Sequence, residues 1–486
     1  MSSIIPEPPV RLPVEKVIQD GPYKVGTLSY TLPGLLLMVL WLLWGDFCFS
    51  LMQAVFPAVA PLMLGKLEAP NWMIALFLST IPGILNATVC PFVSYWSDRY
   101  RSPLGRRIPF ILYTIPFLCL FLVLIGLAPY MADWLVKWGW LQDVRIATLA
   151  FMGFFIVGFQ FFNMFVGSVY YYLFNDVVPA EFLGRFLATF RVVGVVATSG
   201  FYLFVFPKAE THFLGIFVGA AVLYGVVFLL MCRFVKEGQY PPPPRTQDGQ
   251  TVFGGIKTFF KESFSQRFYW LFYLSVAFWA TSGASDVFLI FFSRSVGLSL
   301  EQFGLYTGIG AGISAALLIP CGILSDKFHS LRTMLAASWL AAACSSLPLV
   351  FLLFKVPQEM GFMAWSIAFG LSLPVMALFT ASELPTYMSI LPKQRFGQFC
   401  AATALLRSVF TIFAGLICGL LIDWLKLVDP SRAYLYLPLW PILFQTLSAI
   451  CLGLLYLEWK KLGGDKSYVP PRVIGEPDDE LEYSPR

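Results

Sequence analysis

Five ionisable side chains lie inside long apolar stretches of the sequence. They are three carboxylates and two guanidinium groups, namely Asp46, Asp286, Glu383, Arg191 and Arg407. An ionised group at the centre of a bilayer costs about 2.5–3.5 kcal/mol on insertion scales, so each needs a reason to be there. Burial in a low-dielectric environment favours the neutral form of a carboxylate, so such a group can load a proton on one side of a membrane and release it on the other. The three carboxylates are therefore candidates for proton coupling.

The same five residues also allow a structural explanation. A carboxylate and a guanidinium group on neighbouring helices can form a buried ion pair, as Asp46 could with Arg191 and Asp286 with Arg407. The two arginines could instead bind a substrate or anchor a gate. The sequence alone leaves these alternatives open.

A second set of side chains could recognise a polar, ring-shaped solute. Asn86, Gln160 and Asn163 supply planar amides, and Tyr171 and Trp279 supply aromatic faces. Gln160 and Asn163 are three residues apart and share one face of a helix. Hydrogen-bonding amides beside stacking aromatics are what recognition of a sugar requires. The alternative for the aromatics is ordinary packing against lipid, since the chain has 48 Phe and 14 Trp.

The composition shows which elements must position these residues. The 486 residues are 58% hydrophobic and 13% charged, whereas a soluble domain carries roughly 25% charged residues. Open strands cannot satisfy their backbone groups in lipid, so apolar stretches of this length predict membrane-spanning helices. We expect an all-α membrane protein with twelve transmembrane helices, at about 33–62, 72–95, 108–130, 147–174, 186–207, 213–233, 269–293, 303–324, 333–355, 360–390, 398–424 and 434–458.

The distribution of basic residues predicts the orientation of these helices. Of the 33 Lys and Arg residues, 23 fall in the two tails and in the loops that follow even-numbered spans. By the positive-inside rule both termini are therefore cytoplasmic, which requires an even number of spans. We expect a multi-pass protein of the plasma (inner) membrane whose surroundings are the lipid bilayer, and a monomer.

Other chemistry is poorly supported. A net charge of +5 does not indicate nucleic-acid binding. None of the nine cysteines forms a C-x-x-C pair, and the two histidines, His212 and His329, lie near expected helix ends. A membrane-embedded enzyme would need a catalytic cluster such as paired histidines or a metal set. We therefore expect no enzyme activity, no cofactor and no metal site.

The chain contains an internal repeat. Ser-Asp-Arg at 97–99 follows the second span, and Ser-Asp-Lys at 325–327 follows the eighth. The pattern Pro-x4-Gly-x-Phe-x-Ala begins at Pro179 before the fifth span and at Pro392 before the eleventh. Two six-helix halves related as parallel repeats describe many secondary transporters.

This repeat predicts the domain organisation. The polar stretch between the halves holds four consecutive prolines at 241–244, and its residues 253–261 read as a short amphipathic helix on the membrane surface. We expect a cytoplasmic N-terminal tail, a six-helix bundle, a cytoplasmic linker with that helix, a second bundle and a cytoplasmic tail, over residues 1–32, 33–233, 234–268, 269–458 and 459–486.

The loop after the second span resembles a family motif. Residues 97–110 read Ser-Asp-Arg-Tyr-Arg-Ser-Pro-Leu-Gly-Arg-Arg-Ile-Pro-Phe. This resembles the G-x-x-x-D-x-x-G-R-R loop motif of the major facilitator superfamily. The longer spacing, the paired arginines and the trailing Pro-Phe are similar to the glycoside–pentoside–hexuronide:cation symporters and the related sucrose–proton symporters. The segment 175–179, Asn-Asp-Val-Val-Pro, is similar to those families too, and the resemblance covers roughly residues 30–460.

The resemblance implies a fold and a function. The fold is two pseudo-symmetric six-helix bundles around a cavity lined by spans 1, 4, 7 and 10, on three of which Asp46, Asp286 and Glu383 fall. The function is import of a sugar or glycoside by proton-coupled symport with alternating access. Where sucrose–proton symporters carry an Asp in mid-span 4, this chain has Gln160 and Asn163. We favour H⁺ over Na⁺, because a sodium site would need a cluster of carboxylates and carbonyls on spans 2 and 4, and span 2 has no carboxylate.

Two alternatives to sugar symport stay open. A carrier of the same family could move another small organic solute, such as a drug, nucleoside or carboxylate, by symport or antiport. A sensor with the same fold would bind its ligand without transporting it.

The repeated loop motif suggests a gate. We expect Asp98 to pair with basic groups of the other half when the inner side closes, and Asp326 to do the same in the second half, which would shift the inward/outward equilibrium. The alternative, charge that only fixes topology, is sufficient for the paired arginines. The gate candidates are Asp98, Arg99, Gly105, Arg106, Arg107, Asp326, Lys327 and Arg332.

Overall fold

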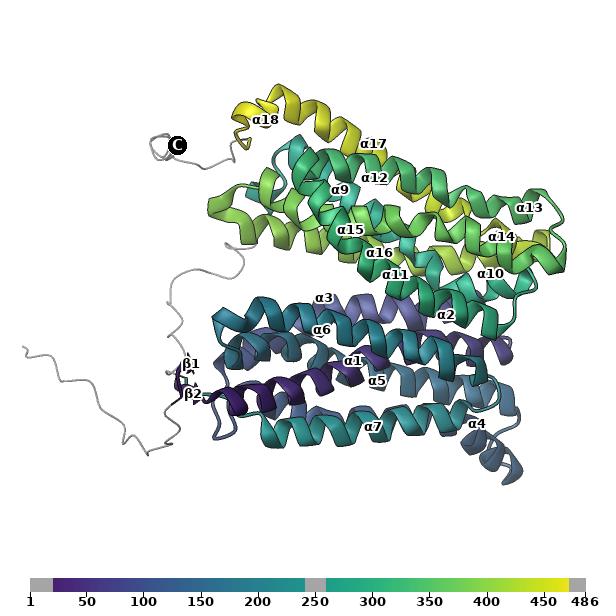
Figure 1. Cartoon of the computed structure of the whole chain (residues 1–486). Helices are drawn as coiled ribbons and strands as arrows, with labels where there is room; N and C mark the ends of the chain where they lie inside the picture. Colours follow the sequence, from purple (N-terminus) through teal and green to yellow (C-terminus); the bar gives the residue numbers. More distant parts are fainter. Residues whose placement is uncertain (1–20, 241–258, 472–486) are drawn as a thin grey trace, which may run out of the picture.

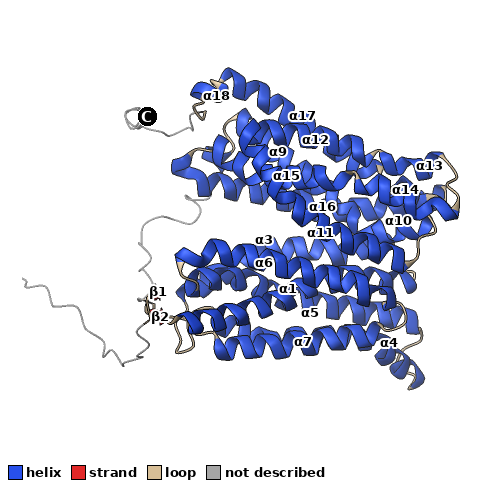
Figure 2. Cartoon of the chain, in the orientation of Figure 1, coloured by secondary structure: helices blue, strands red, loops and turns tan. Residues whose placement is uncertain are grey.

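Twelve helical spans cross the molecule in the computed structural model, which describes residues 21–240 and 259–471. In that part of the chain, the helices long and apolar enough to cross a membrane are Leu32–Lys66, Asn71–Arg99, Ile108–Lys137, Val144–Val177, Ala180–Lys208, Phe213–Phe234, Arg267–Ser295, Leu300–Phe328, Ser330–Leu353, Gln358–Ile390, Phe396–Val428 and Ala433–Lys461. The expected all-α membrane architecture is confirmed (Figure 2). The spans run a few residues longer than predicted, because helix continues beyond the apolar core.

Several spans contain more than one helical element. In the first half the elements are α1 (Leu32–Lys66), α2 (Asn71–Ala75), η1 (Leu76–Thr80), α3 (Ile81–Arg99), α4 (Ile108–Lys137), α5 (Val144–Val177), α6 (Ala180–Gly200), η2 (Phe201–Val205), η3 (Phe206–Lys208) and α7 (Phe213–Phe234). In the second half they are α9 (Arg267–Ser282), η4 (Gly283–Phe288), α10 (Leu289–Ser295), α11 (Leu300–Phe328), α12 (Ser330–Ser345), η5 (Leu347–Leu349), α13 (Val350–Leu353), α14 (Gln358–Gly370), α15 (Ser372–Ile390), η6 (Lys393–Arg395), α16 (Phe396–Val428), η7 (Ala433–Tyr436), α17 (Leu439–Lys461) and α18 (Gly464–Ser467).

Local sequence sets where several helices begin. Thr31 precedes α1, and its side chain accepts from the backbone N–H of Gly34. Asp143 accepts two backbone N–H groups at the start of α5. Ser299 and Gln302 form a capping box before α11. These side chains satisfy backbone donors that a helix leaves unpaired at its first turn.

The two bundles repeat one packing pattern. In the first, α4 packs on α5 and α7, α1 on α6 and α7, and α3 on α5. In the second, α12 packs on α15 and α17, the α9 span on α16 and α17, and α11 on α15. Because each pair in one half has its counterpart in the other, the predicted pseudo-symmetric two-bundle fold is confirmed (Figure 1).

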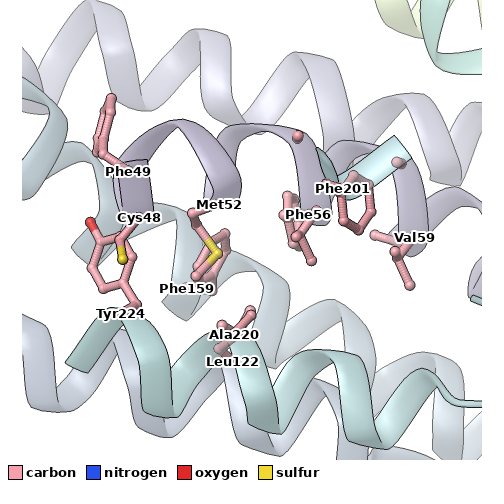
Figure 3. Packing of buried hydrophobic residues seen from close by; sticks show 14 of the residues in the cluster. Cys48, Phe49, Met52, Phe56, Val59, Leu122, Phe159, Phe201, Ala220 and Tyr224 are labelled. Carbon is pink, nitrogen blue, oxygen red and sulfur yellow. The ribbon is translucent and has the colours of Figure 1, made fainter. Parts of the chain in front are cut away.

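The core of the first bundle is aromatic and aliphatic. Figure 3 shows Phe56 of α1 against Phe159 of α5, and their ring centroids are 4.6 Å apart. Met52 lies beside them, and Tyr224 of α7 closes the cluster below Cys48. This packing fixes the positions of α1 and α5, on which several candidate residues lie.

Three spans change helix type within their length. η1 in span 2 and η2 in span 5 are π-helical turns, and η4 in span 7 is a 3-10 segment. η1 packs on α16, and η2 packs on α11. Both π turns therefore lie where the first bundle meets the second, and such turns often mark functional positions in helices.

The two bundles meet toward one end only. We call the end where β1 (Tyr23–Val25), β2 (Leu28–Tyr30) and α18 lie the near end, and the opposite end the far end (Figure 1). Hydrogen bonds join the bundles in the far half: Thr80 donates to the Ile412 carbonyl, and Ser199 to the Gly308 carbonyl. In Figure 1 the bundles diverge toward the near end. The structure is thus closed at the far end.

Segments outside the spans brace each bundle at the near end. β1 and β2 form an antiparallel hairpin in what was expected to be the N-terminal tail. After α18, the hydroxyl of Tyr468 donates to the carbonyl of Ile390, and Tyr269 donates to that of Pro471. The predicted surface helix at 253–261 falls mostly outside the described residues; residues 259–263 are helical.

Candidate functional site

Asp46 is fully buried in α1. The hydroxyl of Ser50, one turn further along, donates to Oδ1 of Asp46 at 3.2 Å. The second oxygen, Oδ2, has no hydrogen-bond partner in the described part of the chain. A buried carboxylate in this state is half satisfied, which is costly for an ionised group and suits a group that carries a proton.

The α6 helix approaches Asp46 through a glycine. A methyl group added at Gly194 would lie 2.9 Å from Oγ of Ser50 and 3.8 Å from Oδ2 of Asp46. Arg191 lies one turn away on α6 and interacts electrostatically with Asp46. It forms no ion pair within 4.0 Å among the described residues. The pairing of Asp46 with Arg191 that the sequence allowed is therefore a longer-range attraction.

The amide candidates occupy two different environments. Gln160 and Asn163 of α5 are buried, with 6% and 7% of their surfaces exposed. Oδ1 of Asn163 has no hydrogen-bond partner in the described residues. Asn86 of α3 is exposed. The structure thus buries two of the three amides, and these two are neighbours on one helix.

The aromatic candidates also differ. Tyr171 is 46% exposed, and its ring meets Phe49 and Phe190 edge-on. Trp279 of α9 is stacked face to face on Phe379 of α15. One face of Trp279 is therefore occupied by the protein itself, whereas about half of the Tyr171 surface is exposed.

Asp286 lies in the 3-10 segment of span 7. It is an exposed residue of η4, and η4 packs on α16 and approaches η1 across the bundle interface. Asp286 forms no ion pair in the described residues, so the pair with Arg407 that the sequence allowed does not form. The interrupted helix places this carboxylate on an irregular backbone, as in transporters whose sites use broken helices.

Arg407 pairs with Glu383 instead. Nη1 of Arg407 lies 3.7 Å from Oε1 of Glu383, and the side chains are 53% and 25% exposed. The hydroxyl of Tyr387 lies at 3.5 Å from the same carboxylate oxygen. This half-exposed pair joins α15 to α16 within the second bundle.

The loop after span 2 forms a compact charged network at the near end. Asp176, at the end of α5, accepts from Arg106 at 2.5 Å and from Arg107 at 3.4 Å. Arg107 also pairs with Asp98 and donates to Ser97. The Asp176 carboxylate raises the pKa of the Arg106 guanidinium. In this conformation Asp98 pairs within its own half.

The remaining members of that loop shape it. Gly105 has a φ of 107°, a left-handed conformation that favours glycine. Arg99 stacks over the ring of Tyr95, with its guanidinium carbon 4.1 Å from the ring centroid.

Glu237 completes the network and was not among the predicted residues. Its carboxylate accepts from the backbone N–H groups of Arg106, Arg107 and Ile108, at 2.9, 2.8 and 2.5 Å. These are the donors at the start of α4, so Glu237 caps that helix from the segment after α7. Burial raises the pKa of the Glu237 carboxyl above its ordinary value, despite these bonds. In the sequence, the only indication of this cap is an acidic residue just past the end of span 6.

The second repeat of the motif is looser. Asp326 is exposed and has no ion pair or hydrogen-bond partner among the described residues. Lys327 lies over the ring of Phe328, and Arg332 pairs with Asp465 of α18. The nearest counterpart of the first network is Arg395, which pairs with Glu262 at 3.0 Å.

A polar latch at the far end was also missed. Asp423, near the end of α16, accepts from the backbone N–H of Asn71 at 2.9 Å, its side-chain amide at 2.7 Å and the backbone N–H of Trp72 at 2.9 Å. The hydroxyl of Tyr434 donates to Oδ1 of Asn71 at 2.8 Å. We call Asn71, Asp423 and Tyr434 the far-end latch, because they join span 2 to spans 11 and 12.

The site offers no metal centre in the described chain. No group of three or more His, Cys, Asp or Glu residues converges there. The chemistry within reach is proton binding by isolated carboxylates and hydrogen bonding by amides and hydroxyls.

The fold is that of a class of membrane transporter. The chain has the major facilitator fold, with two six-helix bundles that enclose isolated polar groups and close at one end. The model of the Major Facilitator Superfamily matches residues 192–415. Together with its structural neighbours, this match indicates a transporter and not an enzyme.

Solved structures share the fold at low sequence identity. The chain is similar to a bacterial homologue of the iron transporter ferroportin in an inward-facing state, with 16% identity, a TM-score of 0.66 and coverage of 87% of this chain and 99% of that one. The nucleoside transporter NupG shares 12% identity, with a TM-score of 0.62 over 86% and 99%. A bacterial homologue of the human lysosomal transporter Spinster, inward-facing and unoccupied, shares 16% identity, with a TM-score of 0.62 over 88% and 97%. No curated protein sequence matches the chain.

Proposed function

We propose that the protein imports a sugar or glycoside by proton-coupled symport with alternating access. It would work as a monomer in the plasma (inner) membrane, with both termini cytoplasmic as the basic residues predict. In that orientation the far end is extracellular, and the structure closed there is the state that opens to the cytoplasm. Residues 33–233 and 269–458 would move as two units, tethered by the linker at 234–268.

The main support for the proposal is the environment of the Asp46 carboxylate. It is buried, and among the described residues only one of its two carboxylate oxygens has a hydrogen-bond donor. A proton on Oδ2 removes the cost of an ionised group at this depth. After the proton leaves toward the cytoplasm, the attraction of Arg191 partly stabilises the carboxylate. Asp286 and Glu383 are the second and third candidates, and Glu383 already has a cation beside it.

The buried amides support a hydroxylated substrate. Oδ1 of Asn163 is a buried acceptor without a donor in the described residues. Sugar hydroxyls donate and accept hydrogen bonds, so they could satisfy Asn163 and Gln160 together. The exposed part of the Tyr171 ring offers a surface for the sugar ring. Asn86, Trp279, Arg191 and Arg407 remain secondary candidates for contacts to the substrate.

The near-end loops supply the proposed gate. When the cytoplasmic side closes, the near ends of the bundles must approach, and Asp326 is then available for a cation of the first half. Asp98 would have to share or exchange its present partner, Arg107. The cytoplasmic gate thus comprises the two repeats of the loop motif, which bias the equilibrium between states rather than bind the solute.

Uptake into proteoliposomes tests the proposal. Labelled sucrose, maltose and glucose are offered with and without an inward proton gradient, to the wild type, Asp46→Asn and the matched Asp286→Asn. We expect the gradient to stimulate uptake of one sugar, and Asp46→Asn to abolish that stimulation while sugar exchange at equal pH persists. Uptake indifferent to the gradient would refute the coupling.

A carrier for another organic solute is the alternative. One structural neighbour is described as a nucleoside transporter, and amides beside an aromatic ring also suit a nucleoside. Labelled uridine and adenosine therefore belong in the same assay. If folded protein transports a nucleoside but none of the sugars, the substrate is a nucleoside and not a sugar. The role of Asp46 is then tested by whether the proton gradient stimulates nucleoside uptake in the wild type and not in Asp46→Asn.

A further inference from the structure

A lateral apolar groove separates α16 from α17 in the second bundle. Its volume is about 630 Å³, within the usual range for small-molecule sites. Phe413, Ile417 and Leu443 form its rim and are 57%, 53% and 54% exposed. Ala414 and Trp440 line its depth and are buried. The groove therefore opens between two membrane-spanning helices and is closed behind.

The residues that line the groove favour a hydrocarbon ligand. Beyond apolar carbon it presents the hydroxyls of Thr281 and Tyr436 and the thiol of Cys418. The Thr281 hydroxyl already donates to the carbonyl of Ala277. A polar ligand would lose its hydration without compensation there, whereas an acyl chain meets apolar contacts along its length. Because spans 11 and 12 lie in the membrane, the bilayer itself supplies such chains.

The back of the groove contacts the interrupted part of span 7. The indole N–H of Trp440 donates to the carbonyl of Thr281 at 2.9 Å. Thr281 lies in the last turn of α9, two residues before η4 begins. Cys418, also in the lining, is close enough to Asp286 in η4 to interact with it electrostatically. The groove thus adjoins the irregular segment that carries Asp286.

We propose that this groove binds one hydrocarbon chain of a membrane lipid, and that the bound chain holds Trp440 against Thr281 and so steadies the η4 segment. A filled groove prevents α17 from collapsing toward α16, which keeps the indole in place. The occupant is a lipid chain rather than a transported solute, because the groove faces the bilayer and its lining is almost entirely apolar. This site is independent of the proposed substrate.

A photoreactive lipid tests the binding. Phosphatidylcholine with a diazirine on its acyl chain is reconstituted with the full-length protein, which is extracted into detergent, freed of bulk lipid and then irradiated. We expect label concentrated in residues 409–425 and 437–444, and a loss of at least fivefold in Ala414→Phe, whose ring fills the groove. The matched variant Val226→Phe, on an exposed face of α7, should keep the wild-type pattern. The binding site would be refuted if the label over residues 409–425 and 437–444 were no denser than over residues 216–230, or if Ala414→Phe did not reduce it.

Hydrogen–deuterium exchange tests the effect on η4 independently. Exchange at 283–288 should be several-fold faster in delipidated wild-type protein than in protein that retains its lipid. Ala414→Phe should stay slow in both, since its own side chain occupies the groove. Equal exchange of 283–288 with and without lipid, while binding is intact, would refute the coupling. If Ala414→Phe fails to fold, Ile417→Trp at the rim provides the same comparison.

Discussion

Asp423 near the end of α16 caps the start of span 2 by accepting from both the backbone and the side-chain amide of Asn71. Asn71 is fully buried, and the two residues are 352 positions apart in the sequence. The carboxylate lies at a helix N-terminus, where backbone donors are unpaired and negative charge is favourable. The bond joins the two bundles, so it exists only while the far end is closed.

Removing this cap should favour opening of the far end. Asp423→Ala deletes an acceptor of three hydrogen bonds, and bonds to a charged group contribute about 1.5–3 kcal/mol each. In the open state of the wild type, water takes the place of these three hydrogen bonds and recovers part of their free energy. We therefore expect Asp423→Ala to shift the equilibrium by about 2 kcal/mol, or roughly 30-fold, toward the state open at the far end. Spin labels at Trp140→Cys and Leu353→Cys would report a longer distance between the bundles.

The matched control for the latch is Asp429→Ala in the following loop. Its carboxylate accepts from Ser431 within the same loop, and in the part of the chain that the structure describes it makes no bond across the bundles. An equal shift in both variants would mean that far-end charge in general, not the contact with Asn71, sets the equilibrium.

Two glycines at the bundle interface should behave in the same way for a steric reason. A methyl group at Gly419 would lie 2.6 Å from the carbonyl oxygen of Asn71, and one at Gly304 would lie 2.4 Å from that of Tyr202. Neither backbone can yield without moving a helix. Gly419→Ala and Gly304→Ala should therefore prevent full closure and lengthen the same spin-label distance.

Gly453→Ala and Gly312→Ala serve as controls for those substitutions. No atom lies within 4 Å of a methyl group added at either position. Both are helical, so alanine should leave the equilibrium unchanged and raise helix propensity slightly. A closed far end in Gly304→Ala and Gly419→Ala would contradict the tight interface.

Asp176 should be critical for stability. It pairs with Arg106 and Arg107, and its side chain is only 8% exposed. Asp176→Asn leaves Arg106 without its anion and Arg107 with Asp98 alone, and breaking a buried pair in this way is strongly destabilising. We expect a loss of about 3 kcal/mol in the free energy of unfolding, measured by denaturant titration in detergent. Asp133→Asn, which breaks the exposed pair with Lys137, should cost less than about 1 kcal/mol.

Glu237 should make stability depend on pH. Its pKa is raised by burial in the folded protein, so the folded state binds a proton more tightly than the unfolded state does. Its contribution to stability is then fully present below the ordinary pKa of 4.5 and is lost as pH rises through the folded value. Thermal unfolding from pH 4 upward should show this decline in the wild type and not in Glu237→Gln. A parallel pH profile for both proteins would assign the dependence to other groups.

The sequence predicted the spans because the signal is local. Each stretch of some twenty apolar residues is readable without knowing its neighbours, and all twelve are helices. The repeat at Pro179 and Pro392 likewise predicted two equivalent halves. The positions of Asp46, Asp286 and Glu383 within spans followed from the same reading, whereas their roles stay predictions.

The partners of these residues were not predictable. The sequence allowed Arg407 to pair with Asp286, but α15 lies beside α16 and places Glu383 within reach. Ser50 could be expected to bond Asp46, since they are four apart on one helix. Nothing local indicated that Gly194 would bring α6 against that pair.

What the sequence determined by itself is the class of the molecule: a twelve-span helical membrane protein in two related halves, with a few ionisable groups where charge is expensive. Hydrophobic composition and repeat spacing carry that information along the chain. Only the tertiary structure decided which end is closed, that Asp423 caps span 2 and that Glu237 caps α4. These contacts join residues more than a hundred positions apart, and their geometry depends on how whole helices pack rather than on any local pattern.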